Sequence, residues 1–208
     1  MAERLVDLTL RAFTDDLASD APVPGGGSAA AYAGALGAAL AAMVARIATK
    51  RSDDPSLREF IAEMDGLRGD FLRLVDDDSA AYARVADAMK LPKASDEEKK
   101  LRSERMQSAL MAASRVPLEL ANTSRRLLGA CERGLEKAPA AAVSDIGVGA
   151  LMAEAALRGA AMNVMINLAS VKDRAQVKAL SEELDRALDG ADAQRRKITD
   201  FVESRIAR

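Results

Sequence analysis

The stretch that decides the fold is residues 55–89, PSLREFIAEMDGLRGDFLRLVDDDSAAYARVADAM. Two series of residues recur in it every seventh position. The first is Leu57, Met64, Phe71, Asp78 and Val85, and the second is Phe60, Leu67, Leu74, Ala81 and Ala88. This spacing places both series along one face of a helix. We therefore predict one long helix over residues 55–89 with an apolar seam, ended by Leu91-Pro92-Lys93.

A helix of small residues is predicted just before this one. Residues 22–28, PVPGGGS, end a first helical segment at residues 5–17 and allow another helix to start. In the helix predicted over residues 28–49, small residues recur at every fourth position: Ala30, Gly34, Ala38 and Ala42. Small side chains let a neighbouring helix approach closely, so we expect this helix at the centre of a bundle.

The rest of the chain carries further helix-start signals. Ser95 opens a capping-box sequence, and Pro117 is placed at the start of the next helix. Ser144 can cap a helix that reaches about residue 168. Asp173 can cap the last helix, which can continue through Gly190.

Composition agrees with an all-helical fold. Hydrophobic residues are 49% of the 208, but aromatic residues are only 3%, which argues against a β-sandwich or barrel. No segment has the pattern of a strand. We predict an all-α protein, an antiparallel helical bundle with long helices around a small-residue central helix, in which residues 1–208 form a single domain.

Charge and cysteine content exclude several classes of protein. The formal net charge is −2 with both signs mixed, so no basic stripe for nucleic acid is expected. Cys131 is the one cysteine, which excludes an intrachain disulfide and suits a reducing, cytoplasmic compartment. The N-terminus has no apolar signal-peptide region, and the uncharged residues 29–45 are mostly Ala and Gly, which barely favour lipid. We expect no membrane span.

The chain contains no histidine, and this limits its chemistry. Proton transfer must fall to Asp, Glu, Lys, Tyr or Cys131. A His-ligated metal site is excluded, and one cysteine disfavours structural zinc. Cys131 lies among leucines, so we interpret it as a buried, inert thiol.

Asp78 is the first candidate for chemistry, since it interrupts the apolar seam. A carboxylate there is costly unless it is paired or its pKa rises, and perturbed carboxylates cluster at functional sites. The alternative is a structural Asp bonded to Arg, Lys or a backbone amide.

Asn163 and Asn167 form a second candidate, because they lie four residues apart on one helix face among apolar neighbours. The alternative for them is amide bonding between core helices.

Helix starts give the remaining candidates. Gly25, Gly26, Gly27 and Ser28 expose backbone N–H groups before a helix, which suits a carboxylate, a phosphate or an oxyanion; the alternative is a simple turn. Asp145 follows Ser144, where its charge favours the helix start. On an unbroken helix it lies about 27 Å from Asn163, at 1.5 Å per residue. The two would meet only across different sites or subunits.

Together these motifs resemble one known family. Residues 24–40, PGGGSAAAYAGALGAAL, resemble the opening motif of the formiminotetrahydrofolate cyclodeaminase and methenyltetrahydrofolate cyclohydrolase family. The resemblance continues in the same order over nearly the whole chain. It includes Asp78-x-x-Ala81-Tyr82, Leu91-Pro92-Lys93, Val116-Pro117-Leu118, Ser144-Asp145 and the segment from Asn163 to Leu168.

The resemblance implies an all-helical homodimer that acts on folates without a cofactor. A cyclodeaminase closes 5-formiminotetrahydrofolate to 5,10-methenyltetrahydrofolate and releases ammonia. A cyclohydrolase opens the methenyl ring to 10-formyltetrahydrofolate. The Gly-Gly-Gly-Ser motif and the ending at residues 166–168 favour the cyclodeaminase slightly. A formiminotransferase partner is then expected as a separate protein.

The resemblance also implies roles for the candidate residues. Asp78 would carry the N10 proton to the departing ammonia, or would instead bind the pterin amino group. The two asparagines would orient the pterin or the amidine, and the glycine run with Lys93 would hold the glutamate tail. A non-catalytic helical scaffold is the alternative of a different class. A ferritin-like metal bundle fails because it needs Glu-x-x-His pairs.

Overall fold

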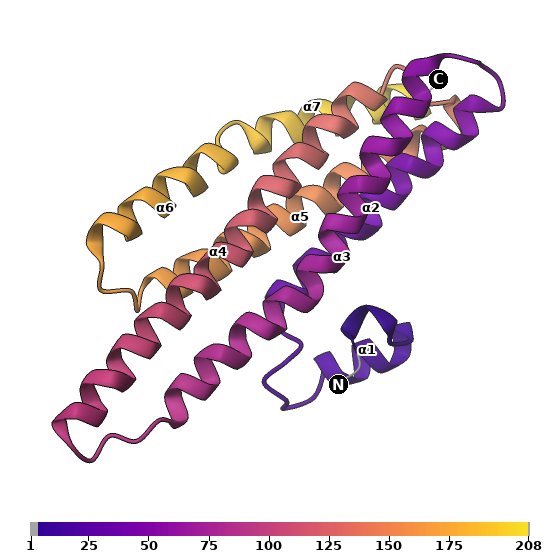
Figure 1. Ribbon diagram of the computed structural model, residues 1–208. Coiled ribbons are helices and arrows are strands. Elements are labelled where there is room, and N and C mark those ends of the chain that lie inside the picture. Colours follow the sequence, from indigo (N-terminus) through magenta and orange to yellow (C-terminus); the bar gives the residue numbers. More distant parts are fainter. Residues whose placement is uncertain (1–3, 208) are drawn as a thin grey trace.

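The computed structural model describes residues 4–207, and this part of the chain is helical with no strand (Figure 1). The elements in chain order are η1 (Leu5–Asp7), α1 (Leu10–Leu17), α2 (Gly26–Thr49), α3 (Pro55–Lys90), α4 (Asp96–Gly134), η2 (Ala140–Ala142), α5 (Val143–Leu168), α6 (Arg174–Leu188) and α7 (Ala191–Ile206). The all-α prediction is confirmed.

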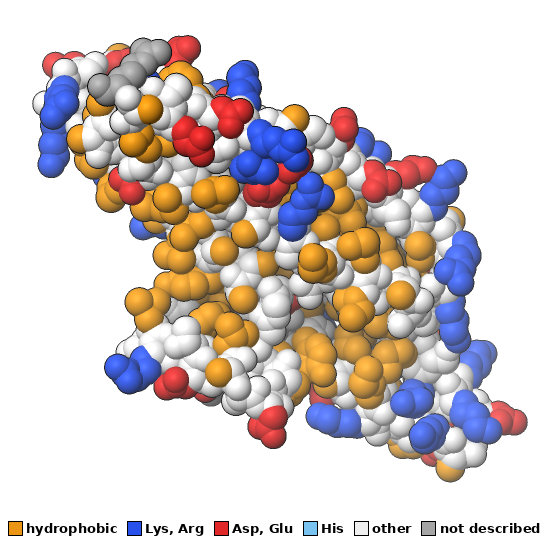
Figure 2. Space-filling view, turned by 180° about the vertical axis from the view of Figure 1, so that it is seen from behind, with side chains coloured by type: hydrophobic (Ala, Val, Ile, Leu, Met, Phe, Trp, Pro, Cys, Tyr) orange, Lys and Arg blue, Asp and Glu red, His pale blue; other side chains and the backbone are white. Residues whose placement is uncertain are grey.

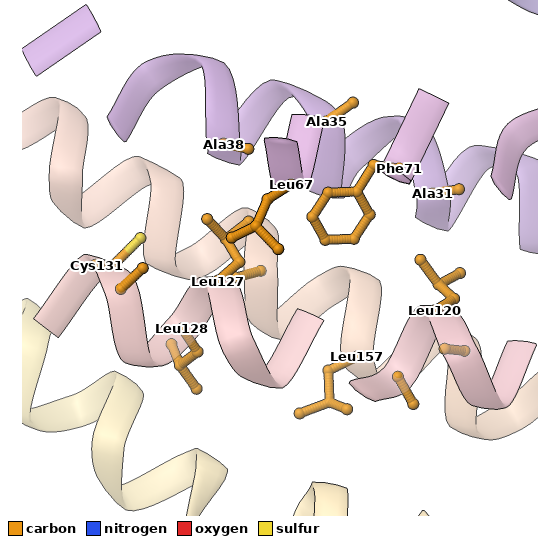
Figure 3. Close-up of a cluster of buried hydrophobic side chains, with 14 of the residues drawn as sticks. Ala31, Ala35, Ala38, Leu67, Phe71, Leu120, Leu127, Leu128, Cys131 and Leu157 are labelled. Carbon is orange, nitrogen blue, oxygen red and sulfur yellow. The ribbon is translucent and has the colours of Figure 1, made fainter. Parts of the chain in front are cut away.

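Helices α2 to α5 form an elongated bundle, and α6 and α7 run along its α4 and α5 side (Figure 1). In the core, small side chains of α2 lie beside larger ones of α3 and α4 (Figure 3). Gly37 of α2 and Gly149 of α5 touch so closely that a Cβ on Gly37 would lie 2.9 Å from the Gly149 carbonyl. The central position predicted for α2 is therefore confirmed.

The long helix predicted from the seven-residue repeat is also confirmed, as α3. Asp54 caps its start by accepting the Ser56 N–H, and Pro55 occupies its first turn. Every apolar member of the two repeat series is buried. Asp78 is the exception, since it is half-buried.

The structure corrects three helix boundaries. Pro117 does not begin a helix: α4 starts at the Ser95 capping box and runs through Pro117 to Gly134. Ser144 does not cap α5, because that helix continues from a 3₁₀ turn and Ser144 already lies in its first turn. The last helix is divided at Gly190, whose φ of 65° is left-handed and ends the regular helical path.

The N-terminal boundaries also shift. Residues 5–17 form two pieces, because Thr9 accepts the Ala12 N–H and starts α1 afresh. Helix α2 begins at Gly26, so Gly26 and Gly27 belong to its first turn. Residues 26–49 and 140–168 are long and apolar enough to cross a membrane, a test that core helices also pass. Both pack against other helices of this bundle, which bury 61% and 50% of their most apolar stretches.

Candidate active site

A cavity of about 350 Å³ lies where the start of α2 meets the later half of α3, the middle of α4 and the end of α5. Its polar lining consists of the glycine run at residues 25–27, Asp78, Asn163, Asn167 and Ser170. Apolar or aromatic residues form the remaining wall: Pro22, Val23, Ala81, Tyr82, Val85, Met89, Leu110, Ala113 and Ile166. The fold thus brings together three separate groups of candidates that the sequence had suggested.

Asp78 is held by the first turn of α2. Its Oδ2 accepts the backbone N–H of Ser28 at 2.9 Å and lies 3.1 Å from the Ser28 hydroxyl. Its Oδ1 accepts no hydrogen bond from the described residues, and it is not a fully buried atom. One carboxylate oxygen is therefore anchored and the other is free on the cavity side.

Burial raises the pKa of the Asp78 carboxyl above its ordinary value, while the bonds from Ser28 lower it less strongly. No Lys or Arg in the described part of the chain forms an ion pair with Asp78. Its neighbours Asp76 and Asp77 are paired instead, with Arg4 and Arg73. An unpaired carboxyl with a raised pKa is suited to accepting and returning a proton.

The three glycines have different surroundings. A Cβ on Gly27 would lie 2.1 Å from Asp78 Oδ1, so Gly27 must lack a side chain for the carboxylate to occupy its place. A Cβ on Gly26 would meet only Asn163 Nδ2 at 3.8 Å, and one on Gly25 would meet nothing within 4 Å. Among the described residues, no partner takes the backbone N–H of Gly26 or Gly27, and Gly26 is exposed whereas Gly27 is buried.

The two asparagines are each held through the amide nitrogen. Asn163 Nδ2 donates to the Gly159 carbonyl at 2.9 Å, and Asn167 Nδ2 donates to the Ala113 carbonyl of α4 at 2.8 Å. Their side-chain oxygens accept no hydrogen bond from the described chain. Each asparagine therefore has an unused acceptor at the cavity.

The structure does not bring every candidate into the cavity. Ser28 is fully buried behind Asp78 and does not line it. Asp145 lies in the first turn of α5, at the opposite end of that helix from Asn163, and also does not line it. Cys131 is fully buried, and burial raises the pKa of its thiol to about 12, which agrees with an inert thiol.

Lys93 lines a neighbouring groove of about 380 Å³. This basic groove is also lined by Lys99, Arg102, Ser103, Met106, Gln107 and Lys172, and no acidic residue lines it. Two contacts join it to the cavity. Arg102 donates to the carbonyl of Met89, and Gln107 donates to that of Ser170. Sequence reasoning found only Lys93 here, because the other cations come from α4 and from the turn after α5.

The arrangement can bind a flat heterocycle and move a proton. The apolar wall can cover a ring. The three free side-chain oxygens, of Asp78, Asn163 and Asn167, can accept from N–H groups, and Asp78 can exchange a proton.

No group of three Cys, Asp or Glu side chains suited to a metal ion occurs in the part of the chain that the structure describes. Tyr82, which is 44% exposed at the cavity, was noticed in the sequence only as part of a motif.

Comparison with known proteins places the chain in a family of folate enzymes. Residues 9–186 match the family described as formiminotransferase-cyclodeaminase, and the chain belongs to that family. It is 38% identical to the methenyltetrahydrofolate cyclohydrolase of Methylorubrum extorquens, over 95% of this chain and 97% of that protein.

Two further similarities involve cyclodeaminases. The chain is 33% identical to the rat (Rattus norvegicus) formimidoyltransferase-cyclodeaminase, where the match covers 98% of this chain but only 38% of the rat protein. The crystal structure of the formiminotetrahydrofolate cyclodeaminase from Thermotoga maritima superposes with a TM-score of 0.83 at 27% identity. That match covers 95% of this chain and 97% of the other.

Proposed function

We propose that this chain is a folate one-carbon enzyme that acts on the carbon between N5 and N10 of tetrahydrofolate. The observation that carries the proposal is Asp78, an unpaired carboxyl with one free oxygen at a cavity suited to a pterin. Its burial favours a carboxyl that can change protonation state during a reaction. The names of its relatives, a cyclohydrolase and cyclodeaminases, support the same substrate class.

The first candidate reaction is the cyclodeamination of 5-formiminotetrahydrofolate. N10 attacks the carbon of the protonated formimino group and forms a tetrahedral carbon that carries an amino group. Asp78 accepts the N10 proton through Oδ1 and returns it to that amino group. The C–N bond then breaks, ammonia leaves, and 5,10-methenyltetrahydrofolate remains. One proton moves from N10 to the leaving group, so the carboxyl ends as it began.

The second candidate is hydrolysis of 5,10-methenyltetrahydrofolate, supported by the 38% identity to a cyclohydrolase over almost all of both chains. Here water adds to the bridging carbon of the methenyl cation, and Asp78 accepts one proton from that water. Asp78 then returns this proton to N5 as the N5–C bond breaks. The remaining hydroxyl proton passes to solvent as the formyl C=O forms, which gives 10-formyltetrahydrofolate. Both reactions pass through a tetrahedral carbon at the same place. The same carboxyl therefore serves either one.

The basic groove is the proposed site for the glutamate part of the folate. Its four cations are Lys93, Lys99, Arg102 and Lys172, and it adjoins the cavity at Met89 and Ser170. The glutamate of a folate carries two carboxylates at neutral pH, which suits such a groove. This assigns the tail to the groove and leaves the N–H groups of Gly26 and Gly27 for the reacting end.

The test is to incubate the pure protein with each folate separately. Ammonia release from 5-formiminotetrahydrofolate would identify a cyclodeaminase, and loss of methenyl absorbance with 10-formyl product would identify a cyclohydrolase. Asp78→Asn is expected to lower the active reaction by about a hundredfold to ten-thousandfold, as for loss of a general acid–base group. A folded wild type that binds and converts neither folate would instead support the scaffold alternative.

A cytoplasmic homodimer is part of the same proposal. Helices α2 and α5 pack against each other, and both leave large apolar side chains exposed. These are Leu36 and Met43 on α2, and Val148, Leu151, Met162, Met165 and Ile166 on α5. Hydrophobic side chains spread widely over the face seen in Figure 2. An apolar surface of this kind is typical of a protein interface, and a second copy is the proposed occupant.

A further inference from the structure

Pro117 lies inside α4, where proline is normally costly. A proline has no backbone N–H, so the carbonyl four residues earlier loses its helical partner. In α4 that carbonyl belongs to Ala113, and Ala113 lines the candidate active-site cavity. The proline therefore leaves one unpaired backbone acceptor beside the site.

Asn167 of α5 takes this acceptor. Its Nδ2 donates to the Ala113 carbonyl at 2.8 Å, and this hydrogen bond joins α5 to α4. The bond also decides which way the amide faces. In the flipped orientation, the side-chain oxygen would face the carbonyl oxygen, and two acceptors would oppose each other. The amide oxygen is therefore left free for a ligand.

We propose that Pro117 is a positioning residue that orients the Asn167 amide by freeing the Ala113 carbonyl, so that the site presents an acceptor to its ligand. The Asn163 amide is oriented in the same way, because its Nδ2 donates to the Gly159 carbonyl and its oxygen stays free. Asp78 Oδ1 is a third acceptor. The site thus selects a ligand edge rich in N–H donors. This inference rests on the proposed function, in which the amino group and ring N–H groups of a reduced pterin supply that edge.

Replacement of Pro117 separates positioning from stability. Alanine restores a backbone N–H at position 117, which competes with Asn167 for the Ala113 carbonyl. Alanine is also far more favourable than proline in a helix interior. A purely structural proline would be expected to affect folding and ligand binding together. A positioning proline predicts that Pro117→Ala binds worse while its thermal stability holds or rises.

The experiment is calorimetric titration with 5-formyltetrahydrofolate, a stable folate that carries a one-carbon group on N5. Pro117→Ala is expected to lose about tenfold in affinity, as for loss of one well-placed hydrogen bond. Pro139→Ala, which changes a proline away from the cavity, is the matched control and should bind as wild type does. Unchanged affinity in a folded Pro117→Ala protein would overturn the proposal.

A double-mutant comparison tests the route of the effect. If Pro117 acts through Asn167, Pro117→Ala should cause no further loss in an Asn167→Ala background. An equal additional loss in that background would show that Pro117 acts by another route and would overturn the proposal.

A ligand-free measurement separates this inference from the proposed function. In nuclear magnetic resonance spectra of the wild type, the Asn167 side-chain amide should show slow hydrogen exchange, and Pro117→Ala should remove that protection. Exchange as fast as that of a free amide in the wild type would refute the positioning role, even if Pro117→Ala did not fold. Absence of folate binding in the wild type, with a protected Asn167 amide, would refute the proposed function and leave the positioning intact.

Discussion

Replacing Gly27 with alanine is expected to disable Asp78 while the fold survives. The added Cβ would lie 2.1 Å from Asp78 Oδ1, 2.4 Å from its Cγ and 2.6 Å from Oδ2. Ordinary contact begins at 3.4 Å, so the carboxylate must retreat by more than 1 Å. It then loses the two bonds to Ser28 that anchor Oδ2.

The expected magnitudes differ for stability and turnover. A carboxylate on a flexible side chain at the edge of a cavity can move aside into water. A hydrogen bond to a charged group contributes about 1.5–3 kcal/mol when no water replaces it. Water can replace the bonds lost here, so the free energy of unfolding falls by less than this. Alanine in the first turn of α2 offsets up to about 1 kcal/mol of this, because glycine disfavours a helix. Misplacement of a reacting group by about 1 Å can cost about a hundredfold in rate.

The assay compares three neighbouring glycines. Turnover and thermal unfolding are measured for Gly25→Ala, Gly26→Ala and Gly27→Ala. A Cβ at Gly26 makes only ordinary contact and one at Gly25 makes none, so both variants keep the position of Asp78. Gly27→Ala alone should lose about a hundredfold in turnover, with a stability change of no more than about 1 kcal/mol.

The reasoning is refuted if the three variants lose turnover equally, or if Gly27→Ala keeps wild-type turnover. Equal losses would mean that the whole run acts through its backbone alone. Wild-type turnover in Gly27→Ala would mean that the observed place of Asp78 has no part in the reaction.

Three further outcomes are expected. Burial holds the pKa of Asp78 above its unfolded value, so its ionised form costs stability at neutral pH. Asp78→Asn, whose side chain is uncharged at every pH, should therefore raise Tm at pH 7. The gain should shrink as pH falls below that pKa, and a gain that grows at low pH would contradict it. Leu151→Asp, at a residue 48% exposed on α5, should give a monomer by light scattering, whereas Leu101→Asp on α4 should stay dimeric. Lys172→Glu should raise KM several-fold for a folate with its glutamate and not for one without it, and an equal rise for both would exclude the groove.

Local sequence patterns determined the helices and the first candidates. The seven-residue series over residues 55–89 specified α3, and the Ser95 capping box specified the start of α4. Both signals depend on residues three or four apart, which a helix brings together without help from the rest of the chain. The same logic marked Asp78, because an acid in an apolar seam is costly wherever that seam packs.

Only the tertiary structure decided how the candidates act. The sequence presented Gly25, Gly26 and Gly27 as equivalent, but packing of α3 against α2 brings Asp78 against Gly27 alone. In the sequence, Pro117 resembles a helix start, because proline lacks a backbone N–H and the N–H groups of a first helical turn have no partner within the helix. Helix α4 nevertheless continues through it, and Asn167, 50 residues further on, binds the freed carbonyl.

Local sequence patterns also could not predict which residues from different helices lie close together. Lys93 lies in a groove with cations from two other parts of the chain, whereas Asp145 lies at the far end of α5 from the cavity. Periodicity states which face of a helix is apolar, but it does not state which helix ends meet. The site forms where the start of α2 and the end of α5 come together over α3 and α4, and long-range packing alone fixes that meeting point.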